Sequence, residues 1–294
     1  MIELGRLALG TAPIGGLYEA VEDETAHAVV DRAWELGLRY FDTAPRYGAG
    51  LAERRLGAAL IGRRRDEFVV STKVGRLLRP GRSEWGGAPE LVDYFDFSHD
   101  ATLRSLDESL GRLGLDRVDI AFVHDPDDHF DVALAGSFRA LRRLRDEGVV
   151  RAIGVGANQP AVLCRFAREA DPDCFLVAGR FTALDRTAEP ELLPLCQASG
   201  IAVIAGGVFN SGVIAGGTTF DYEAAPPEIV ERVEALREIC ARYGVPLPAA
   251  AVQFPLRHPA VATVLVGCRT QDEVAEDMRL AELEVPAGLW KELA

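Results

Sequence analysis

The chain has 294 residues, of which 48% are hydrophobic and 26% charged, so it can bury a sizeable core in one large domain or two smaller ones. Its formal charge of −13 at pH 7 disfavours nucleic acid and anionic membrane as partners, because both bind through clustered basic side chains. No apolar run reaches the length of about 18 residues that predicts a membrane span, and the N-terminus lacks the pattern of a signal peptide.

Short apolar runs alternate with longer amphipathic stretches along the whole chain. Strands are predicted at residues 7–11, 39–43, 67–73, 118–124, 150–155, 174–178, 201–205 and 261–266. Helices are predicted at residues 22–36, 51–60, 99–113, 132–147, 159–169, 189–198, 227–242, 247–257 and 271–281. The longest irregular stretch is 75–96, and a loop of that length usually has a function or is mobile.

Eight strand–helix units predict an α/β fold, a (β/α)8 TIM barrel that forms a single domain over residues 1–294. A doubly wound sheet normally has fewer strands and carries a glycine-rich fingerprint that is missing here. The motifs of P-loops, zincins and elbow-type serine hydrolases are missing too.

The cysteine pattern favours reduced thiols. An odd number, five, is present, and no two have the C-x-x-C spacing: Cys164, Cys174, Cys196, Cys240 and Cys268. We therefore expect no disulfide framework, no metal site and a cytoplasmic location.

Four ionisable side chains stand at or just after the ends of three consecutive strands. Asp42 ends the second strand with Tyr47 after it, Lys73 ends the third, and His124 ends the fourth. Because the C-terminal strand ends form the active face of a TIM barrel, we expect these side chains to converge. Lysine is rare in this chain: of 32 basic residues only Lys73 and Lys291 are lysines, and we expect Lys291 at the surface and Lys73 buried against Asp42 and Tyr47.

These residue types suit proton transfer between an alcohol and a carbonyl. A phenol with a pKa of about 10 is a weak acid at neutral pH, and a nearby ammonium such as Lys73 lowers that pKa. Asp42 would hold the ammonium, and His124 would orient the reacting oxygen. Singly, Asp42 could be a turn or cap residue, Tyr47 a packing aromatic and His124 a core histidine. Their joint placement favours catalysis.

Six segments resemble the aldo-keto reductase family and together span nearly the whole chain. They are LALGTA at 7–12, FDTAPRYG at 41–48, STKVG at 71–75, LDESLGRL at 106–113, VDIAFVH at 118–124 and VLVGCRT at 264–270. The resemblance implies a nicotinamide-dependent oxidoreductase on a (β/α)8 barrel. It assigns Asp42, Tyr47, Lys73 and His124 to the catalytic tetrad, with Tyr47 as general acid and base.

The resemblance also implies a set of cofactor contacts. They are Gly10, Thr11, Asp42, Asn158, Gly207, Val208, Ser211, Gly267, Arg269, Thr270 and Asp277. Three positions depart from the family pattern. Asn158 stands one position late for the residue that holds the carboxamide, and the family's glutamine and stacking tyrosine are replaced by Ala178 and Gly206.

The segment after the last strand addresses the choice between NAD and NADP. Members that prefer NADP often have a lysine and an arginine where this chain has Gly267 and Glu273. Arg269 could still meet a 2′-phosphate, but a carboxylate at Glu273 would repel it. We therefore expect NAD, or use of both cofactors, over strict NADP dependence. The alternative interpretation of Glu273 is an ordinary solvated helix residue.

The segments HDPDDH at 124–129 and GGVFNSG at 206–212 resemble the sugar-oxidising branch, which acts on L-fucose or D-threo-aldoses and has pyridoxal 4-dehydrogenases nearby. This implies oxidation of an aldose at C1 to the lactone. The alternatives are an NADPH-dependent reductase of aldehydes and ketones, or a pyridoxal 4-dehydrogenase. Arg46, Trp85 and Asp125 are the candidate substrate contacts, although Trp85 could equally serve loop packing.

Two interpretations from other classes stay open. Lys73 could be the Schiff-base amine of an aldolase, or the barrel could bind a cofactor without catalysis. In each case we expect a small-molecule ligand and a monomer or small homo-oligomer.

Overall fold

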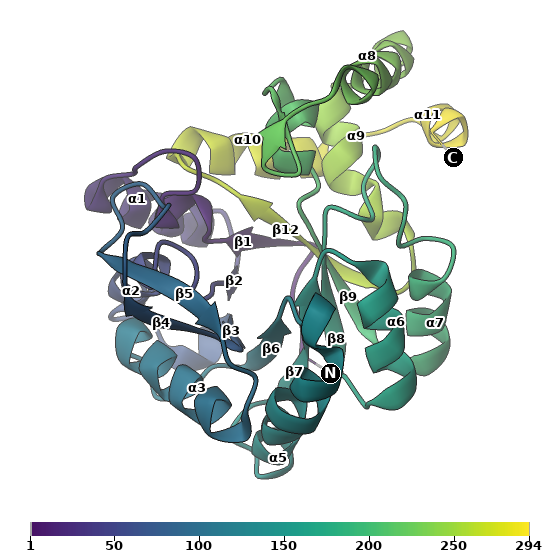
Figure 1. The fold of residues 1–294 in the computed structure, drawn as a ribbon. Helices are drawn as coiled ribbons and strands as arrows, with labels where there is room; N and C mark the ends of the chain where they lie inside the picture. Colours follow the sequence, from purple (N-terminus) through teal and green to yellow (C-terminus); the bar gives the residue numbers. More distant parts are fainter. Residues whose placement is uncertain (1, 294) are drawn as a thin grey trace.

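The computed structural model describes residues 2–293 and closes eight parallel strands into one barrel (Figure 1). In chain order the barrel strands are β1 (Leu7–Gly10), β2 (Tyr40–Asp42), β3 (Val69–Val74), β6 (Ile120–His124), β7 (Ala152–Ala157), β8 (Cys174–Ala178), β9 (Ala202–Gly206) and β12 (Val261–Gly267). Each strand pairs with its neighbour in the chain, and β12 pairs with β1 to close the ring. The predicted (β/α)8 fold is confirmed.

Helices surround the barrel, as Figure 1 shows. They are α1 (Asp23–Glu35), α2 (Leu51–Leu60), α3 (His99–Leu113), α4 (Phe130–Ala133), α5 (Arg139–Asp146), α6 (Pro160–Glu169), α7 (Leu192–Ser199), α8 (Pro227–Arg242), α9 (Leu247–Gln253), α10 (Gln271–Glu282) and α11 (Ala287–Glu292). Two helices start at side-chain caps: Ser98 accepts the N–H of Ala101 in α3, and Thr270 accepts the N–H of Glu273 in α10.

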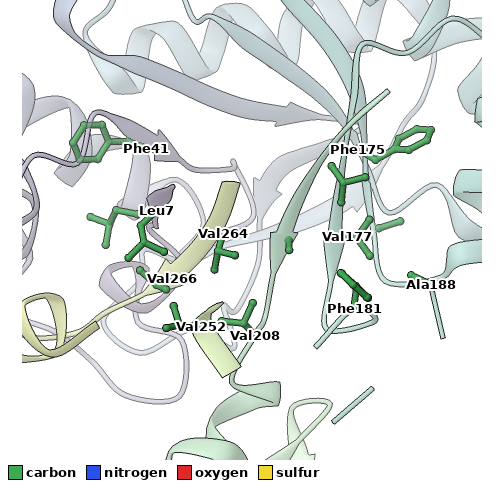
Figure 2. Packing of buried hydrophobic residues seen from close by; sticks show 14 of the residues in the cluster. Leu7, Phe41, Phe175, Val177, Phe181, Ala188, Val208, Val252, Val264 and Val266 are labelled. Atoms are coloured by element: carbon green, nitrogen blue, oxygen red, sulfur yellow. The ribbon is translucent and has the colours of Figure 1, made fainter. Parts of the chain in front are cut away.

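The core has two layers, because successive side chains of a strand point to opposite sides of the barrel wall. The larger cluster lies between strands and helices, and Figure 2 shows part of it, with Leu7, Val266 and Val252 from β1, β12 and α9. The smaller cluster includes Phe122 and Ile204 and fills the barrel interior. Since the interior is filled, a ligand can reach only the ends of the strands.

The segment 75–96 is not irregular, and that prediction was wrong. It forms an antiparallel hairpin of β4 (Arg76–Pro80) and β5 (Leu91–Phe95), in which Arg76 pairs with Phe95 and Pro80 with Leu91. The glycines and prolines that suggested a loop are concentrated in its turn, while the strands themselves are only five residues long.

Other predicted elements differ at their ends or in their interior. The predicted helix 132–147 is interrupted by a π-helical turn, Leu134–Phe138, where Gly136 lies against the backbone of Phe97 so closely that a Cβ would come within 2.0 Å of its oxygen. The helix predicted at 247–257 ends at Gln253, before Pro255. The helix predicted at 189–198 is α7, which starts three residues later, at Leu192. The sequence analysis did not predict α11 or the small hairpin of β10 (Thr219–Phe220) and β11 (Glu223–Ala224).

Candidate active site

The C-terminal ends of β2, β3 and β6 bring Asp42, Lys73 and His124 together with Tyr47. The first three are buried, and Tyr47 is half-buried in the loop after β2. The Lys73 Nζ donates to Asp42 Oδ2 at 2.6 Å and lies 4.6 Å from the centroid of the Tyr47 ring. The rings of Tyr47 and His124 are nearly perpendicular, with centroids 6.0 Å apart.

Local backbone geometry fixes Tyr47 at the barrel mouth. The Tyr47 N–H donates to the Ala44 carbonyl at 3.1 Å, and the Ala52 N–H at the start of α2 donates to the Tyr47 carbonyl at 3.2 Å. The next residue, Gly48, has a φ of +60°, and a Cβ there would lie 2.2 Å from the Gly15 oxygen. Only glycine allows the loop after β1 to pack this closely against the tyrosine-bearing turn.

Two further side chains, which sequence reasoning missed, extend this cluster into the barrel. The Ser71 hydroxyl donates to Asp42 Oδ1 at 2.7 Å, and Tyr40 shares a hydrogen bond with Ser71 at 3.0 Å. All three residues are fully buried. Strand periodicity could have found them, because Tyr40 and Asp42 stand two apart on β2, and Ser71 and Lys73 two apart on β3.

The lysine is charged. Burial acts to lower the pKa of Lys73, but Asp42 and Tyr47 favour the ammonium more strongly, and the pKa lies above its ordinary value. The ammonium also donates to the Thr43 carbonyl at 2.9 Å. Lys73 is therefore protonated and held by two acceptors, so it acts as a fixed positive charge and not as a free amine.

Two opposing effects set the pKa of Tyr47: the charge of Lys73 and the burial of the phenol. Lys73 does act to lower the pKa of Tyr47, but burial raises it more, and Asp42 adds to that increase, so the pKa lies above its ordinary value. The expected direction of the Lys73 effect is therefore confirmed, and the desolvation of the phenolate outweighs it.

The imidazole is neutral at pH 7. Burial lowers the pKa of His124 well below its ordinary value, and the cations of Lys73, Arg76 and Arg46 act in the same direction. Nδ1 of His124 is buried without a hydrogen-bond partner among residues 2–293, and Nε2 lies 3.6 Å from Asp125 Oδ2. A neutral imidazole can donate a hydrogen bond from Nε2 but has no proton to spare as an acid.

The three expected substrate contacts surround this cluster. Trp85, in the turn of the β4–β5 hairpin, has its ring 5.8 Å from that of Tyr47. Asp125 follows His124 directly, with 31% of its side chain exposed. Arg46 precedes Tyr47 and donates to Asp93 at 2.7 Å. All three lie at the barrel mouth, and two of them take part in ion pairs.

Most of the expected cofactor contacts lie at the ends of β1, β7, β9 and β12. Gly207 and Gly267 are exposed, and Asn158 at the end of β7 presents an exposed amide that makes no side-chain hydrogen bond with residues 2–293. Gly10 and Thr11 are buried at the end of β1, where the Thr11 hydroxyl has no partner in the described part of the chain. Val208 is buried just after β9. Ala178 and Gly206, which replace larger family residues, pair with each other.

Other expected cofactor contacts have protein partners. Arg269 donates to Glu19 at 3.0 Å, and its guanidinium lies 3.7 Å from Glu273, which also accepts the Arg269 N–H at 2.6 Å. The Ser211 hydroxyl accepts the N–H of Tyr222 in the β10–β11 turn at 3.1 Å.

Asp277 is largely buried and accepts from the Cys268 thiol at 3.4 Å. Burial raises the pKa of Asp277 to about 7, and the carboxylates of Glu273 and Glu276 contribute to the increase.

These residues fit a nicotinamide dinucleotide. The Asn158 amide offers both a donor and an acceptor for a carboxamide, close in the barrel to the Tyr47 cluster. The glycines Gly207 and Gly267 at the ends of β9 and β12 are exposed, and Thr270 caps an α10 N-terminus that favours anions. The fit is poorer for a 2′-phosphate, because Asp272 and Glu273 occupy the first turn of α10 and Arg269 is already paired.

Within residues 2–293, no group of three or more His, Cys, Asp or Glu side chains could hold a metal ion. All five cysteines are free and buried. In the same range, no helix combines the length and apolar character needed to cross a membrane.

Comparisons with known proteins agree with the fold and the chemistry of the site. The family model described as the aldo/keto reductase family matches residues 6–294. A D-threo-aldose 1-dehydrogenase from a Pseudomonas species is 44% identical over 304 residues, covering 98% of this chain and 92% of the relative. A pyridoxal 4-dehydrogenase from Microbacterium luteolum is 40% identical over 316 residues, with the same two coverages. A solved aldo-keto reductase from Bacillus halodurans, in its holo form, superposes with a TM-score of 0.80 at 26% identity, covering 98% of this chain and 92% of that one.

Proposed function

The chain belongs to the aldo/keto reductase family, and we propose that it oxidises the C1 hydroxyl of an aldose to the lactone, with a nicotinamide dinucleotide as hydride acceptor. Nicotinamide-dependent oxidoreduction is the chemistry of this family. The observation that carries the proposal is the Asp42–Lys73–Tyr47–His124 cluster at the barrel mouth, where polar and charged side chains surround a tyrosine poised to exchange a proton. The 44% identity to a D-threo-aldose 1-dehydrogenase supports the choice of substrate class.

Each member of the cluster has a separate task in this reaction. Tyr47, as phenolate, accepts the proton of the C1 hydroxyl, and Lys73 stabilises that phenolate while Asp42 holds the ammonium. His124, neutral, donates a hydrogen bond from Nε2 to the reacting oxygen. When bound, the nicotinamide supplies the hydride acceptor and, in its oxidised form, a further positive charge. The reverse reaction, reduction of a carbonyl, uses the phenol of Tyr47 as the acid.

The cofactor would be held by residues at the ends of β7, β9 and β12. Asn158 would bind the carboxamide, and the backbone around Gly207 and Gly267 together with the α10 N-terminus would bind the phosphate-bearing part. Small residues at 178 and 206 would leave room for the ring.

The geometry disfavours an aldolase. A Schiff-base lysine must lose its proton to act as a nucleophile. Here the Lys73 ammonium is held by Asp42 and the Thr43 carbonyl, and its pKa is raised above the ordinary value. We therefore expect borohydride to trap no carbonyl substrate on Lys73.

A substrate panel tests the proposed function. The wild-type protein is incubated with NAD+ or NADP+ and L-fucose, D-threo-aldoses, other aldoses or pyridoxal, and formation of reduced cofactor is followed by absorbance. Simple aldehydes are tested with the reduced cofactors. We expect aldoses to give the highest kcat/KM. Preference for pyridoxal would replace the substrate assignment, whereas tight cofactor binding without turnover of any compound would indicate a binding protein.

We propose a preference for NAD+, because the Arg269 guanidinium, which could meet a 2′-phosphate, is paired with Glu19 and Glu273. We expect the Glu19→Gln/Glu273→Gln variant to lower KM for NADP+ relative to KM for NAD+ by about tenfold, equivalent to about 1.4 kcal/mol. Steady-state kinetics with both cofactors measures this ratio. The control is Glu282→Gln, which removes one carboxylate charge at the far end of α10. An unchanged ratio would show that the pairing of Arg269 does not govern selectivity.

Alcohol oxidation should accelerate as pH rises from about 7 to 10, because oxidation requires the phenolate of Tyr47. Burial keeps the pKa of Tyr47 above its ordinary value in spite of Lys73, so the phenolate fraction grows about tenfold per pH unit over this range. Carbonyl reduction requires the phenol and should stay nearly flat over the same range. The measurement is kcat in both directions at saturating cofactor. An oxidation profile independent of pH would contradict this role for Tyr47.

We also propose a reducing, cytoplasmic location and a monomer or small homo-oligomer. The five free, buried thiols support the location. Size-exclusion chromatography with light scattering measures the oligomeric state.

A further inference from the structure

Four charged side chains form an alternating chain that ends at the proposed catalytic histidine. Asp93 on β5 binds two arginines, one with each oxygen: Arg46 at 2.7 Å and Arg76 at 3.0 Å. Arg76 on β4 in turn binds two carboxylates. Its Nη1 donates to Asp93, and its Nη2 donates to Asp125 at 2.8 Å. The side chains of Asp93 and Arg76 are 16% and 13% exposed, so water screens this central pair only weakly.

The last member of this chain is held in an unusual backbone conformation. Asp125 has a φ of +46°, in the left-handed region that non-glycine residues rarely adopt. The turn brings the Asp125 Oδ2 back to 3.6 Å from Nε2 of His124, the residue before it. The Asp125 N–H donates to the Gly156 carbonyl on β7 at 2.9 Å, so the backbone is anchored on one side and the carboxylate by Arg76 on the other. Strained positions of this kind cluster at functional sites.

The hairpin that supplies Arg76 and Asp93 is also fixed at its turn. The Gly86 N–H donates to the Gly16 carbonyl at 3.1 Å, and a Cβ on Gly16 would lie 2.1 Å from the Gly86 oxygen. Near this contact the Trp85 ring lies beside Tyr47. The hairpin is therefore held at two points, the turn against the loop after β1 and the strands against Asp125 and Arg46.

We propose that Arg76 and Asp93 are positioning residues of the active site: they hold the Asp125 carboxylate beside His124, so that the two groups together form the wall that faces the substrate. The proposal rests on the oxidoreductase function proposed above. At 3.6 Å the Asp125 carboxylate is too far from Nε2 to accept a hydrogen bond, but its charge favours the neutral tautomer that carries the proton on Nε2, and that proton stays available for the reacting oxygen. It also leaves Nδ1 as an acceptor, which suits its lack of a partner among the described residues.

This arrangement leaves one Asp125 oxygen available. Arg76 occupies Oδ2, and no side-chain or backbone donor within residues 2–293 hydrogen-bonds to Oδ1. With a third of its side chain exposed, Asp125 can accept a hydroxyl of the substrate while Arg76 keeps the carboxylate in place. Asp93 acts one step further away, because it fixes the arginine rather than the carboxylate.

Substitution on the hairpin tests the proposal. Arg76→Met approximates the length of the side chain but removes its charge. Arg76→Lys keeps the charge but loses the planar fork whose two nitrogens reach Asp93 and Asp125, and Asp93→Asn weakens the hold on Arg76. The matched control is Arg79→Met, which removes an exposed arginine from the same strand. Each variant is assayed with the compound of the substrate panel that the wild type converts fastest. We expect Arg76→Met to raise the KM of that compound about tenfold, with a smaller change in kcat and none in cofactor affinity.

The pH dependence separates positioning from a merely structural role. Charged or titratable groups face His124 and Asp125 from several elements: Lys73, Arg76, Arg46, Tyr47, Asp127 and Tyr222. Burial raises the pKa of Asp125 and Arg76 acts against that increase, whereas burial and Arg76 both lower the pKa of His124. Loss of Arg76 should therefore raise both pKa values and move the acidic limb of kcat/KM to higher pH by about one unit. Arg76→Lys should restore most of this shift. A variant that only loosened the hairpin would lose thermal stability without moving the limb.

Histidine NMR gives a readout that does not depend on turnover. With isotope-labelled histidine, the five histidine signals are followed against pH, and His124→Gln identifies the relevant one. We expect His124 as the Nε2–H tautomer in the wild type, with its protonation midpoint raised in Arg76→Met and unchanged in Arg79→Met. If the wild type converted none of the panel, the proposed function would fail and the NMR arm alone would decide the positioning role. A folded Arg76 variant with unchanged midpoint, tautomer and KM would overturn it.

Discussion

Tyr47→Phe should lower kcat by about two to four orders of magnitude in both reaction directions, the range that general acid–base groups contribute. The phenol oxygen is the group proposed to exchange a proton with the substrate, and the Lys73 ammonium lies over the same ring. Phenylalanine keeps the ring and its contacts with Trp85 and His124, so the fold and cofactor affinity should change little. Single-turnover kinetics with a good substrate measures the loss, and fluorescence titration measures cofactor binding.

The matched control for this substitution is Tyr94→Phe. Tyr94 lies on β5 of the same hairpin as Trp85, and its hydroxyl only accepts a weak 3.4 Å hydrogen bond from Arg104. Loss of a hydroxyl there should leave kcat within twofold. If Tyr47→Phe retained wild-type turnover with every active substrate, proton transfer would have to be assigned to another group, with His124 the nearest alternative.

The barrel was predictable from sequence because each of its strands is an apolar run followed by an amphipathic stretch. The ends of β2, β3 and β6 were predictable for the same reason, since an ionisable residue that closes an apolar run is conspicuous. Asp42, Lys73 and His124 stand in such positions. Each of these residues can be recognised from its own strand. Parallel pairing of the strands in a barrel then brings their side chains together at one end.

What the sequence could not provide are contacts between segments far apart in the chain. Arg76 and Asp93 lie in a stretch whose glycines and prolines hid two short strands, and Asp125, the second carboxylate that Arg76 binds, is 49 residues beyond Arg76. The pairing of Arg269 with Glu19 joins the first and last barrel loops. The net pKa shift of Tyr47 was not predictable for a related reason, because desolvation depends on everything packed around the phenol and not only on the nearest charge.

Lys73→Met should remove activity and also destabilise the protein. The substitution leaves the Asp42 carboxylate buried at 0% exposure without its counter-ion, and breaking a buried pair in this way typically lowers the free energy of unfolding by about 3–5 kcal/mol. Ser71 still donates to Asp42, so the loss should fall in the lower part of that range. Urea denaturation measures it. The control is Lys291→Met, which alters the only other lysine, an exposed residue in α11, and should change neither stability nor turnover.

A double substitution separates the two contributions of Lys73. Lys73→Met/Asp42→Asn removes the unpaired charge as well as the ammonium, so it should recover most of the lost stability, because replacing both partners of a buried pair is far less damaging than removing one. Activity should stay low, since nothing then stabilises the phenolate of Tyr47. A double variant that regained turnover would show that Lys73 serves mainly to neutralise Asp42. A double variant that is stable but inactive would show that the charge of Lys73 is needed for catalysis. That role explains why a chain whose basic residues are almost all arginine has a lysine at this position.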